Sequence, residues 1–470
     1  MAEHPHTQKE RRDDGSEVDT VTFPPGDPED PATGAELGKV ATLGLSTYVG
    51  GLALGPMTLA PLSEVVLRSN SLYIIPYFFY LCFLLGTALV QNLGGFLALR
   101  FLSGLFSSVT IANFGGTIAD LRPRAETGLP MSLFLWAATV GSPSGYFLFA
   151  FVAQTRPWRH VIWALLGVCG GFWLLMTVTL LWCGETRHSV LLLRRAARLR
   201  KETGDENIGV PAKMQRRGYR ELFRVALTRP FRFLFTEAII IFAALYNGYL
   251  YGLSFLFNDA FSLVFGPEGH GFNVIGVGLS FLGIVVGISI GPATNLWQER
   301  YYQRRIRAAG GANIPEARAQ LAQVAAVTFP ISLFIFAWTS YPWLPWIAPI
   351  IASALWGWSF YTLILFTYTY VEDSYGVFSA SALAGIGLVR NAAGAGFPLF
   401  ARQMFVNEGY QWAGTILAFL AVVLVPIPFI LIRYGERLRR RSPWASKIIK
   451  EEGQQNKQVD GGMSDGKAEA

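Results

Sequence analysis

Three charged side chains stand within or at the edge of long apolar stretches of this chain: Arg100, Arg390 and Glu237. A charge in such a setting is costly unless it is paired or faces water, so these residues are candidates for function. Arg390 and its neighbour Asn391 could bind a substrate, or form a structural hydrogen-bonded pair. Glu237 could carry a proton or bind a cationic substrate, or it could have a capping or interface role. Arg100 could have a functional role, or its long side chain could reach the nearby surface of the apolar layer.

Uncharged polar residues and acidic residues near the ends of these stretches add further candidates. Asn113, Tyr246 and Asn247 could line a cavity, although hydrogen bonding between helices explains such residues equally well. Acidic residues also stand where apolar stretches end, and we expect them to pair with nearby arginines and act as a gate. These acidic residues are Asp120, Glu372 and Asp373.

Other kinds of chemistry lack the residues that they need. The sequence contains no GxxxxGK[ST] loop for phosphate, no HExxH pair and no closely spaced cysteines. The five histidines lie in tails or connections, and we interpret the three cysteines as packing residues. The sequence therefore disfavours an ATP-driven pump and an enzyme, and it predicts neither a metal nor a cofactor. Transport without a bound cofactor is the class that remains.

The elements that must position these residues are membrane-spanning helices. Of the 470 residues 52% are hydrophobic and 15% are charged, well below the charge of a soluble domain. Apolar runs recur that are long enough for a helix to cross the hydrocarbon, and a backbone in lipid must pair its own polar groups. We therefore predict an all-α polytopic membrane protein with eleven spans. They cover residues 40–63, 72–91, 93–119, 131–153, 161–183, 233–257, 272–296, 324–341, 344–371, 377–401 and 412–434.

Basic residues indicate the orientation of these spans. Lys and Arg gather in residues 184–232, 300–318 and 433–450, whereas the connections 91–95 and 341–345 carry none. Cytoplasmic connections are enriched in Lys and Arg, so we expect the basic connections and the C-terminus to be cytoplasmic. The clusters adjoin the ends of spans, and attraction to anionic lipid explains the net charge of +7 better than binding of nucleic acid.

The longest basic connection divides the chain unequally. Five spans precede it and six follow, so the two termini should lie on opposite sides of the membrane. The predicted parts are an acidic disordered tail (1–38), a five-span bundle (39–183), a basic cytoplasmic loop (184–232), a six-span bundle (233–435) and a cytoplasmic tail (436–470).

Several segments resemble the fungal drug–proton antiporters of the major facilitator superfamily, the group that includes polyamine exporters. The resemblance covers about residues 41–446 and is specific in aggregate. The segments are GPMTLAPLSE (55–64), RFLSG (100–104), GGTIADL (115–121), GETR (184–187), LTRPF (227–231), AAGGANIPEAR (308–318), EDSYG (372–376) and FPLFARQM (397–404).

This resemblance implies a fold of two helix bundles and roles for particular residues. The family has twelve helices in two halves of six, and the segment that begins at Val40 resembles its second helix. The first helix is therefore expected to be absent, which accounts for the five-to-six division. Arg100 matches the family's buried arginine that is linked to proton coupling. A loop of the family closes one side of the transporter through charge pairs, and here it corresponds to Glu64 and Arg68, with Asp120 as partner.

Two small-residue patterns also bear on helix packing. The region that matches the family's antiporter motif is altered, but Gly141 and Gly145 keep a spacing that favours close helix contact next to Pro143. Gly283, Gly287 and Gly291 recur every four residues, which predicts a stripe of close packing.

The resemblance implies a secondary transporter of the plasma membrane that exports drug-like or polyamine-like compounds in exchange for protons. Its partners would be a small organic substrate, protons and the lipid bilayer, and we expect a monomer that binds no nucleic acid. The alternative is a truncated, transport-inactive paralogue or a gene-model variant, acting at most as a membrane sensor or partner.

Overall fold

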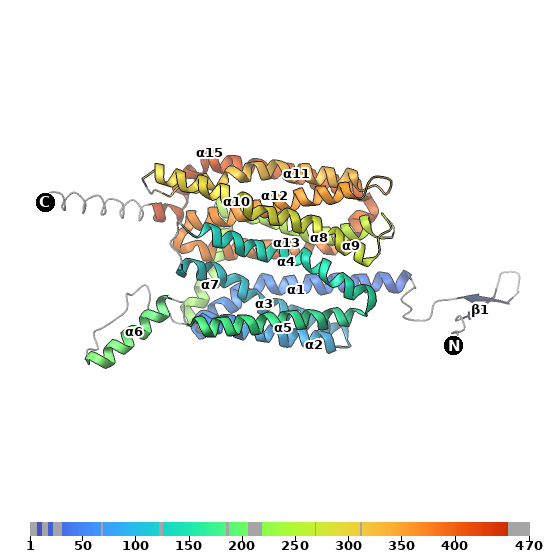
Figure 1. The fold of residues 1–470 in the computed structure, drawn as a ribbon, viewed down its shortest axis with the longest axis horizontal. Helices are drawn as coiled ribbons and strands as arrows, with labels where there is room; N and C mark the ends of the chain where they lie inside the picture. Colours follow the sequence, from blue (N-terminus) through green and yellow to red (C-terminus); the bar gives the residue numbers. More distant parts are fainter. Residues whose placement is uncertain are drawn as a thin grey trace.

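The structure, a computed structural model, is a bundle of long helices that run along a common direction (Figure 1). It describes residues 7–11, 17–21, 31–66, 69–121, 126–184, 188–204, 219–267, 269–310 and 313–449. Eleven helical segments in the described residues are long and apolar enough to span a membrane. Five precede the long basic connection and six follow it, which confirms the predicted fold class and its unequal division.

The five-helix half contains α1 (Pro31–Val66), α2 (Ser69–Leu89), α3 (Leu93–Leu121), α4 (Gly128–Thr155) and α5 (Trp158–Cys183). Two further helices follow in the basic connection, α6 (His188–Thr203) and α7 (Tyr219–Thr236). Figure 1 shows α6 projecting away from the bundle.

The six-helix half is built from α8 (Ala238–Phe265), α9 (Val274–Ser280) with α10 (Leu282–Ala308), the 3₁₀ turn η3 (Pro315–Ala319) with α11 (Gln320–Thr339), α12 (Ile347–Tyr375), α13 (Ser379–Glu408), and α14 (Tyr410–Leu424) with α15 (Pro426–Arg441). A second 3₁₀ turn, η4 (Gly376–Phe378), joins α12 to α13. Gly376 has a φ of +48° there, in the left-handed region that glycine adopts most readily.

The two ends of the bundle differ in charge. The last turns of α10 and α15 carry arginines, and we call the end at which these helices finish the basic end. In Figure 1 the blue start of α1 and the red finish of α15 lie at opposite ends of the bundle. This is the arrangement that an odd number of spans produces.

The N-terminal segment differs from the disordered tail that composition predicts for residues 1–38. An antiparallel hairpin pairs β1 (Thr7–Arg11) with β2 (Glu17–Val21), and α1 begins at Pro31. The register pairs Lys9 with Asp19, and opposite charges in that position favour pairing, as do the Val and Thr residues of β2. The composition of the whole segment hides this local strand pattern. The rest of residues 1–30 lies outside the described residues.

Close contact between helices depends on glycine in both halves. A Cβ atom on Gly104 of α3 would lie 2.0 Å from the backbone oxygen of Tyr48 in α1. On Gly287 of α10 it would lie 1.9 Å from the backbone oxygen of Ala354 in α12. Gly283 and Gly291 are equally crowded by α12, which confirms the predicted stripe.

The other predicted small-residue contact is wrong. A Cβ atom on Gly141 or Gly145 of α4 would meet nothing within 4 Å. These glycines face away from the neighbouring described helices, because α4 instead uses Gly128, Ser132 and Trp136 to contact the six-helix half. A spacing of four shows that two glycines share a helix face, but not that another helix covers that face.

The halves meet through α1 and α4 of the five-helix half. The cores of the two halves differ in size. Helix α1 packs against α13, and α4 packs against α9 and α10. The larger core cluster lies mostly in the six-helix half, whereas the five-helix half holds a small cluster of Tyr80, Leu84, Ala88 and Ile162. In α5 only Ile162 is buried, whereas most of α12 is buried.

Candidate functional site

A half-buried arginine from α13 lies among tyrosines of two other helices. The Arg390 guanidinium donates a hydrogen bond to the hydroxyl of Tyr368 in α12 and lies 4.6 Å from the ring centre of Tyr251 in α8. Its Nε donates to the Oδ1 of Asn391 at 3.3 Å. Tyr251 can approach α13 closely because Gly394 there has no side chain, and a Cβ would lie 3.2 Å from the tyrosine ring.

Asn391 joins this arrangement to the other half. Its Nδ2 donates to the backbone oxygen of Leu52 in α1 at 3.1 Å, and the residue is buried. The hydrogen bond crosses from the six-helix half to the five-helix half. Arg390 and Asn391 therefore form the pair that the sequence suggested, and the pair lies where the halves meet.

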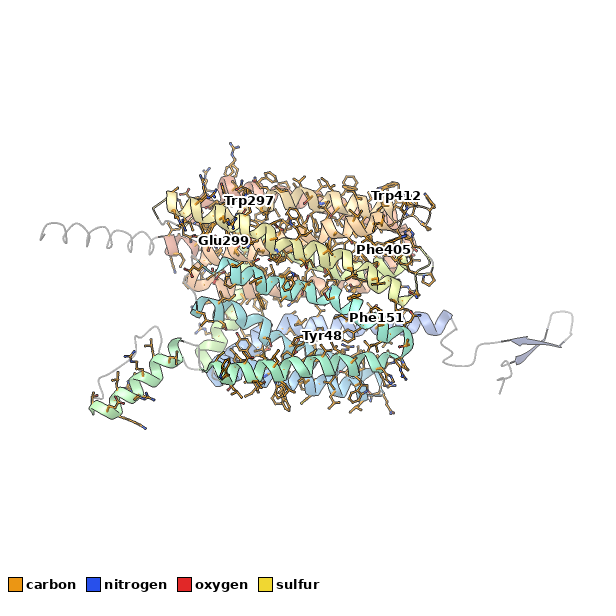
Figure 2. The ribbon with its side chains drawn as sticks, viewed as in Figure 1. Tyr48, Phe151, Trp297, Glu299, Phe405 and Trp412 are labelled. Carbon is orange, nitrogen blue, oxygen red and sulfur yellow. The ribbon has the colours of Figure 1, made fainter. Side chains whose placement is uncertain are left out.

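A second arginine lies on the five-helix side of this contact. The Arg100 guanidinium lies 5.3 Å from the ring centre of Phe96, and its buried Nε has no hydrogen-bond partner. Tyr48 of α1, which hydrogen-bonds to Ser107 at 3.1 Å, interacts electrostatically with both Arg100 and Tyr251. We call Tyr48, Arg100, Tyr251, Tyr368 and Arg390 the arginine–tyrosine cluster. Figure 2 shows Tyr48 between the ends of the bundle marked by Glu299 and Phe405.

Three other predicted cavity residues are not brought to this cluster. Asn247 is buried between α8 and α12, where its Nδ2 donates to Ala243 and to Thr367 at 2.8 and 2.9 Å. Tyr246 is buried in the core of the six-helix half. The geometry thus matches the helix-to-helix alternative for Asn247. The side chain of Asn113 lies outside the described residues.

At the basic end, Asp373 belongs to a buried network of charges. Arg318 of η3 pairs with Asp373 of α12 and, at 3.1 Å, with Glu299 of α10. The Tyr302 hydroxyl donates to Asp373 at 2.7 Å. A second buried pair joins Arg439 to both carboxylate oxygens of Glu316. Of the other expected gate residues, Glu372 is half-buried, and the side chains of Glu64 and Asp120 and all of Arg68 are outside the described residues.

Contacts from α4 connect this charged network to the five-helix half. Gly128, the first residue of α4, lies so close to Glu299 that an added Cβ would be 2.2 Å from its Oε2. A helix N-terminus carries partial positive charge, so this placement stabilises the carboxylate. One turn on, Tyr361 donates to the backbone oxygen of Ser132 at 2.8 Å and also bonds its hydroxyl.

Glu237 is buried at the junction of α7 and α8. Its Oε2 accepts hydrogen bonds from Tyr375, at 2.9 Å, and from Ser442, which follows α15. Its Oε1 is buried and has no hydrogen-bond partner. Glu237 precedes α8 but makes no side-chain capping bond, so the capping alternative does not hold.

Sequence reasoning missed two groups of charged residues. Asp259 was assigned to a connection because the predicted span ended at residue 257, but α8 continues to Phe265 and keeps Asp259 inside the helix. The sequence patterns did not predict the ion pairs of three further charged residues. Arg318 and Glu316 belong to a basic stretch and a family-like motif, and Glu299 adjoins that stretch. Their pairing depends on η3 folding back against α10 and α12, which apolar periodicity does not predict.

The two cavities described among these helices are small. One, of about 20 Å³, is lined by Asn295, Gln298 and Arg318, among others. The other, of about 10 Å³, lies between the halves and is lined by Ser142, Ser254 and Asn258, among others. Each has room for about one water molecule, whereas a drug-sized ligand needs roughly 300 Å³ or more. Binding such a ligand at either of these cavities therefore requires the helices to move apart.

No cluster that could hold a metal ion is found in the described part of the chain, where groups of at least three His, Cys, Asp or Glu residues were sought. The polar chemistry of the site is thus that of guanidinium, phenol, amide and carboxylate groups.

Comparison with known proteins places these features in a family. The Major Facilitator Superfamily model matches residues 31–384. The chain is 36% identical over 410 residues to the major facilitator superfamily multidrug transporter mdrA of Aspergillus fumigatus, covering 87% of this chain and 67% of the relative. It is also 36% identical to the efflux pump atB of Aspergillus terreus, over 84% of this chain and 83% of the relative.

A solved structure agrees on the fold. The proton:xylose symporter XylE superposes with a TM-score of 0.57 at 14% identity, covering 87% of this chain and 88% of the symporter. At that identity the likeness concerns the arrangement of helices alone.

Proposed function

The chain belongs to the major facilitator superfamily, and from this membership we propose that it exports drug-like or polyamine-like organic compounds in exchange for protons. The observation that carries the proposal is the extensive identity to proteins named as multidrug transporters and efflux pumps. That identity spans both halves of the bundle, so it includes the contacts through which the halves would move.

The proposed mechanism is a rocking motion of the two halves around a central site. The contacts that would open and close are α1 with α13 and α4 with α10. Both small cavities and the arginine–tyrosine cluster lie beside these contacts, which supports a substrate path there. The networks at Arg318 and Glu237 would hold the basic end together while the opposite end is open.

Two residues are proposed to couple this motion to protons. Glu237 is a buried carboxylate with one oxygen that no hydrogen bond satisfies, and a proton on that oxygen would remove its charge. Arg100 is a half-buried guanidinium beside the contact between the halves, and it would respond to charge that enters the site. The gate would include Asp373, paired with Arg318.

We further propose a monomer in the plasma membrane with the basic end in the cytoplasm. The concentration of arginines in the last turns of α10 and α15 supports this orientation, because cytoplasmic connections carry the excess of basic residues.

The test is transport by purified protein in vesicles with an imposed pH gradient. Toxic amines, azole-like drugs and aromatic acids are tested, and we expect each compound that the protein exports to move only while the gradient lasts. Glu237→Gln and Arg100→Ala should abolish coupling, whereas Glu436→Gln and Arg440→Ala, which disrupt an exposed pair on α15, should leave it intact. Gradient-dependent transport that survives both substitutions would remove the proposed coupling roles.

The competing proposal is that the chain is inactive in transport. The unequal number of helices in the two halves favours this proposal. If no compound moves, a first helix is grafted at residues 31–40 and the assay repeated. If transport then appears, the missing helix explains the inactivity. The chain without the graft would in that case act at most as a membrane sensor or partner.

A further inference from the structure

The arginine–tyrosine cluster contains two half-buried cations and no anion. Arg390 has Tyr368, Asn391 and the ring of Tyr251 as partners, and Arg100 has the ring of Phe96. Among the described residues, neither guanidinium has a carboxylate within ion-pair distance. Phenol hydroxyls, an amide oxygen and aromatic faces stabilise a cation, but they do not neutralise it.

Two arginines elsewhere in the described residues are buried and do have carboxylate partners. Arg318 pairs with Asp373 and Glu299, and Arg439 pairs with Glu316. Each of these pairs closes contacts at the basic end of the six-helix half. Within the described part of the chain, carboxylates therefore pair with the arginines that hold the structure together, whereas the two arginines where the halves meet have none.

The intramembrane carboxylate of α8 does not fill this role. Asp259 lies eight residues beyond Tyr251, about 12 Å along the helix axis, and its electrostatic partner is Arg402 of α13. Because the described residues supply no carboxylate to Arg390 or Arg100, a molecule that enters between the halves would supply the balancing charge.

We infer that this site binds an organic anion, a compound with a carboxylate head on an aromatic or apolar body. A carboxylate accepts two parallel hydrogen bonds from a guanidinium and removes the cost of burying the positive charge unpaired. The rings of Tyr48, Tyr251 and Phe255 provide apolar surface for the body of such a molecule. Phe255 packs edge-on against Tyr251, with ring centres 5.3 Å apart.

This inference rests on the proposed transport function and narrows its substrate class. A polyamine would bring positive charge next to two guanidinium groups. Like charges in close proximity repel strongly where water is scarce. Among the compounds that such exporters could carry, the cluster therefore selects acids over amines.

The test measures binding by the full-length protein in detergent, without any gradient. Three probes share one skeleton and differ only in the head group: 2-naphthoate, 2-naphthamide and 2-naphthylmethylamine. Each is titrated by calorimetry at neutral pH against the wild type. We expect the acid to bind at least about tenfold more tightly than the amide, and the amine to bind most weakly. Binding of the amine equal to or stronger than that of the acid would overturn the inference, and this comparison needs no variant.

Variants then assign the preference to the cluster. Arg390→Gln should lose about tenfold or more in affinity for the acid and little for the amide, and Arg390→Lys should retain part of it. Arg440→Gln, on the exposed face of α15, is the matched control and should bind as the wild type does. Unchanged acid affinity in Arg390→Gln, with the thermal transition of the wild type, would place the anion elsewhere.

The outcomes separate this inference from the transport proposal. Acid-selective binding without transport would support the anion site and contradict the transport proposal. Gradient-driven export of amines without acid binding would confirm transport and overturn the anion site.

Discussion

Arg318 shows how much of the charge in this chain serves to hold helices together. Its guanidinium lies 3.7 Å from the ring centre of Tyr302 and pairs with Asp373 and Glu299, carboxylates of two different helices. All three charged groups are largely removed from solvent. Loss of the cation would leave two neighbouring carboxylates unpaired in a setting of low polarity, which costs far more than the pair itself contributes.

Arg318→Ala is therefore expected to destabilise the protein by about 3–5 kcal/mol. The measurement is the thermal unfolding of detergent-purified protein, followed by circular dichroism. Arg440→Ala breaks a pair whose side chains are 70% and 64% exposed, and it should shift the transition little. Equal shifts in the two variants would contradict a structural role for the buried network.

Helices α10 and α12 pack more closely than side chains would permit. At Gly287 the backbone of α12 lies where a Cβ atom would be, so even alanine forces the helices apart. On α4, by contrast, Gly141 has free space around it. The same residue type thus has opposite effects in two helices, depending on whether a neighbour covers it.

We expect Gly287→Ala to lower stability by about 1–3 kcal/mol through overpacking. Gly141→Ala should raise it by up to about 1 kcal/mol, since alanine favours the helix where no clash opposes it. Thermal unfolding of the two variants, compared with the wild type, checks both signs. Destabilisation by both substitutions would mean that Gly141 also lies in a close contact.

The segment that follows α15 closes the basic end of the six-helix half. The ring centre of Trp444 lies 5.3 Å from that of Phe233 and 4.9 Å from that of Phe378, and the guanidinium of Arg232 lies over its face. Ser442 donates to the buried Glu237. One aromatic side chain thus attaches the segment to α7 and η4, and one hydroxyl attaches it to the residue that precedes α8.

Trp444→Ala should release this segment, because the substitution removes its contacts with both phenylalanines. Limited trypsin digestion, followed by mass spectrometry, should show faster cleavage after Arg440, Arg441 and Lys447 than in the wild type. Trp182→Ala, which alters a tryptophan that is 89% exposed on α5, should leave the cleavage pattern unchanged. Unaltered cleavage in Trp444→Ala would show that other contacts hold the segment.

The whole molecule is unevenly packed. Most buried residues belong to the six-helix half, whereas the five-helix half has a small core and an α5 in which one residue is buried. Regions with few buried contacts open at lower free energy than the core of the same protein. The five-helix half should therefore open first, although both halves contain helices of similar length.

Hydrogen exchange in detergent or nanodiscs measures this difference directly. Under identical conditions, backbone amides of α5 and α2 are expected to exchange faster than those of α12 and α8. Equal protection throughout would mean that the lipid or detergent compensates fully for the smaller core. Faster exchange in the six-helix half would contradict the expectation.

The sequence predicted the features of single helices better than the contacts between helices. Eleven spans, their unequal division and the stripe at Gly287 follow from apolar run length and small-residue spacing, which depend on one helix at a time. The pairing of Arg318 with Asp373 joins residues 55 positions apart, and only the fold-back of η3 brings them together. For the same reason Arg390 and Asn391 could be proposed as a pair, but their contact with Leu52 of α1 could not.

The hydrogen bonds between Tyr361 and Ser132 have a consequence for the speed of the transport cycle. They cross from one half to the other and are buried, so a rocking motion that opens the basic end must break them before water can replace them. Breaking such bonds adds an enthalpic contribution to the activation barrier, and turnover should slow steeply in the cold. Tyr361→Phe, which lacks the hydroxyl, should flatten the Arrhenius plot of turnover, even if the substrate preference stays the same.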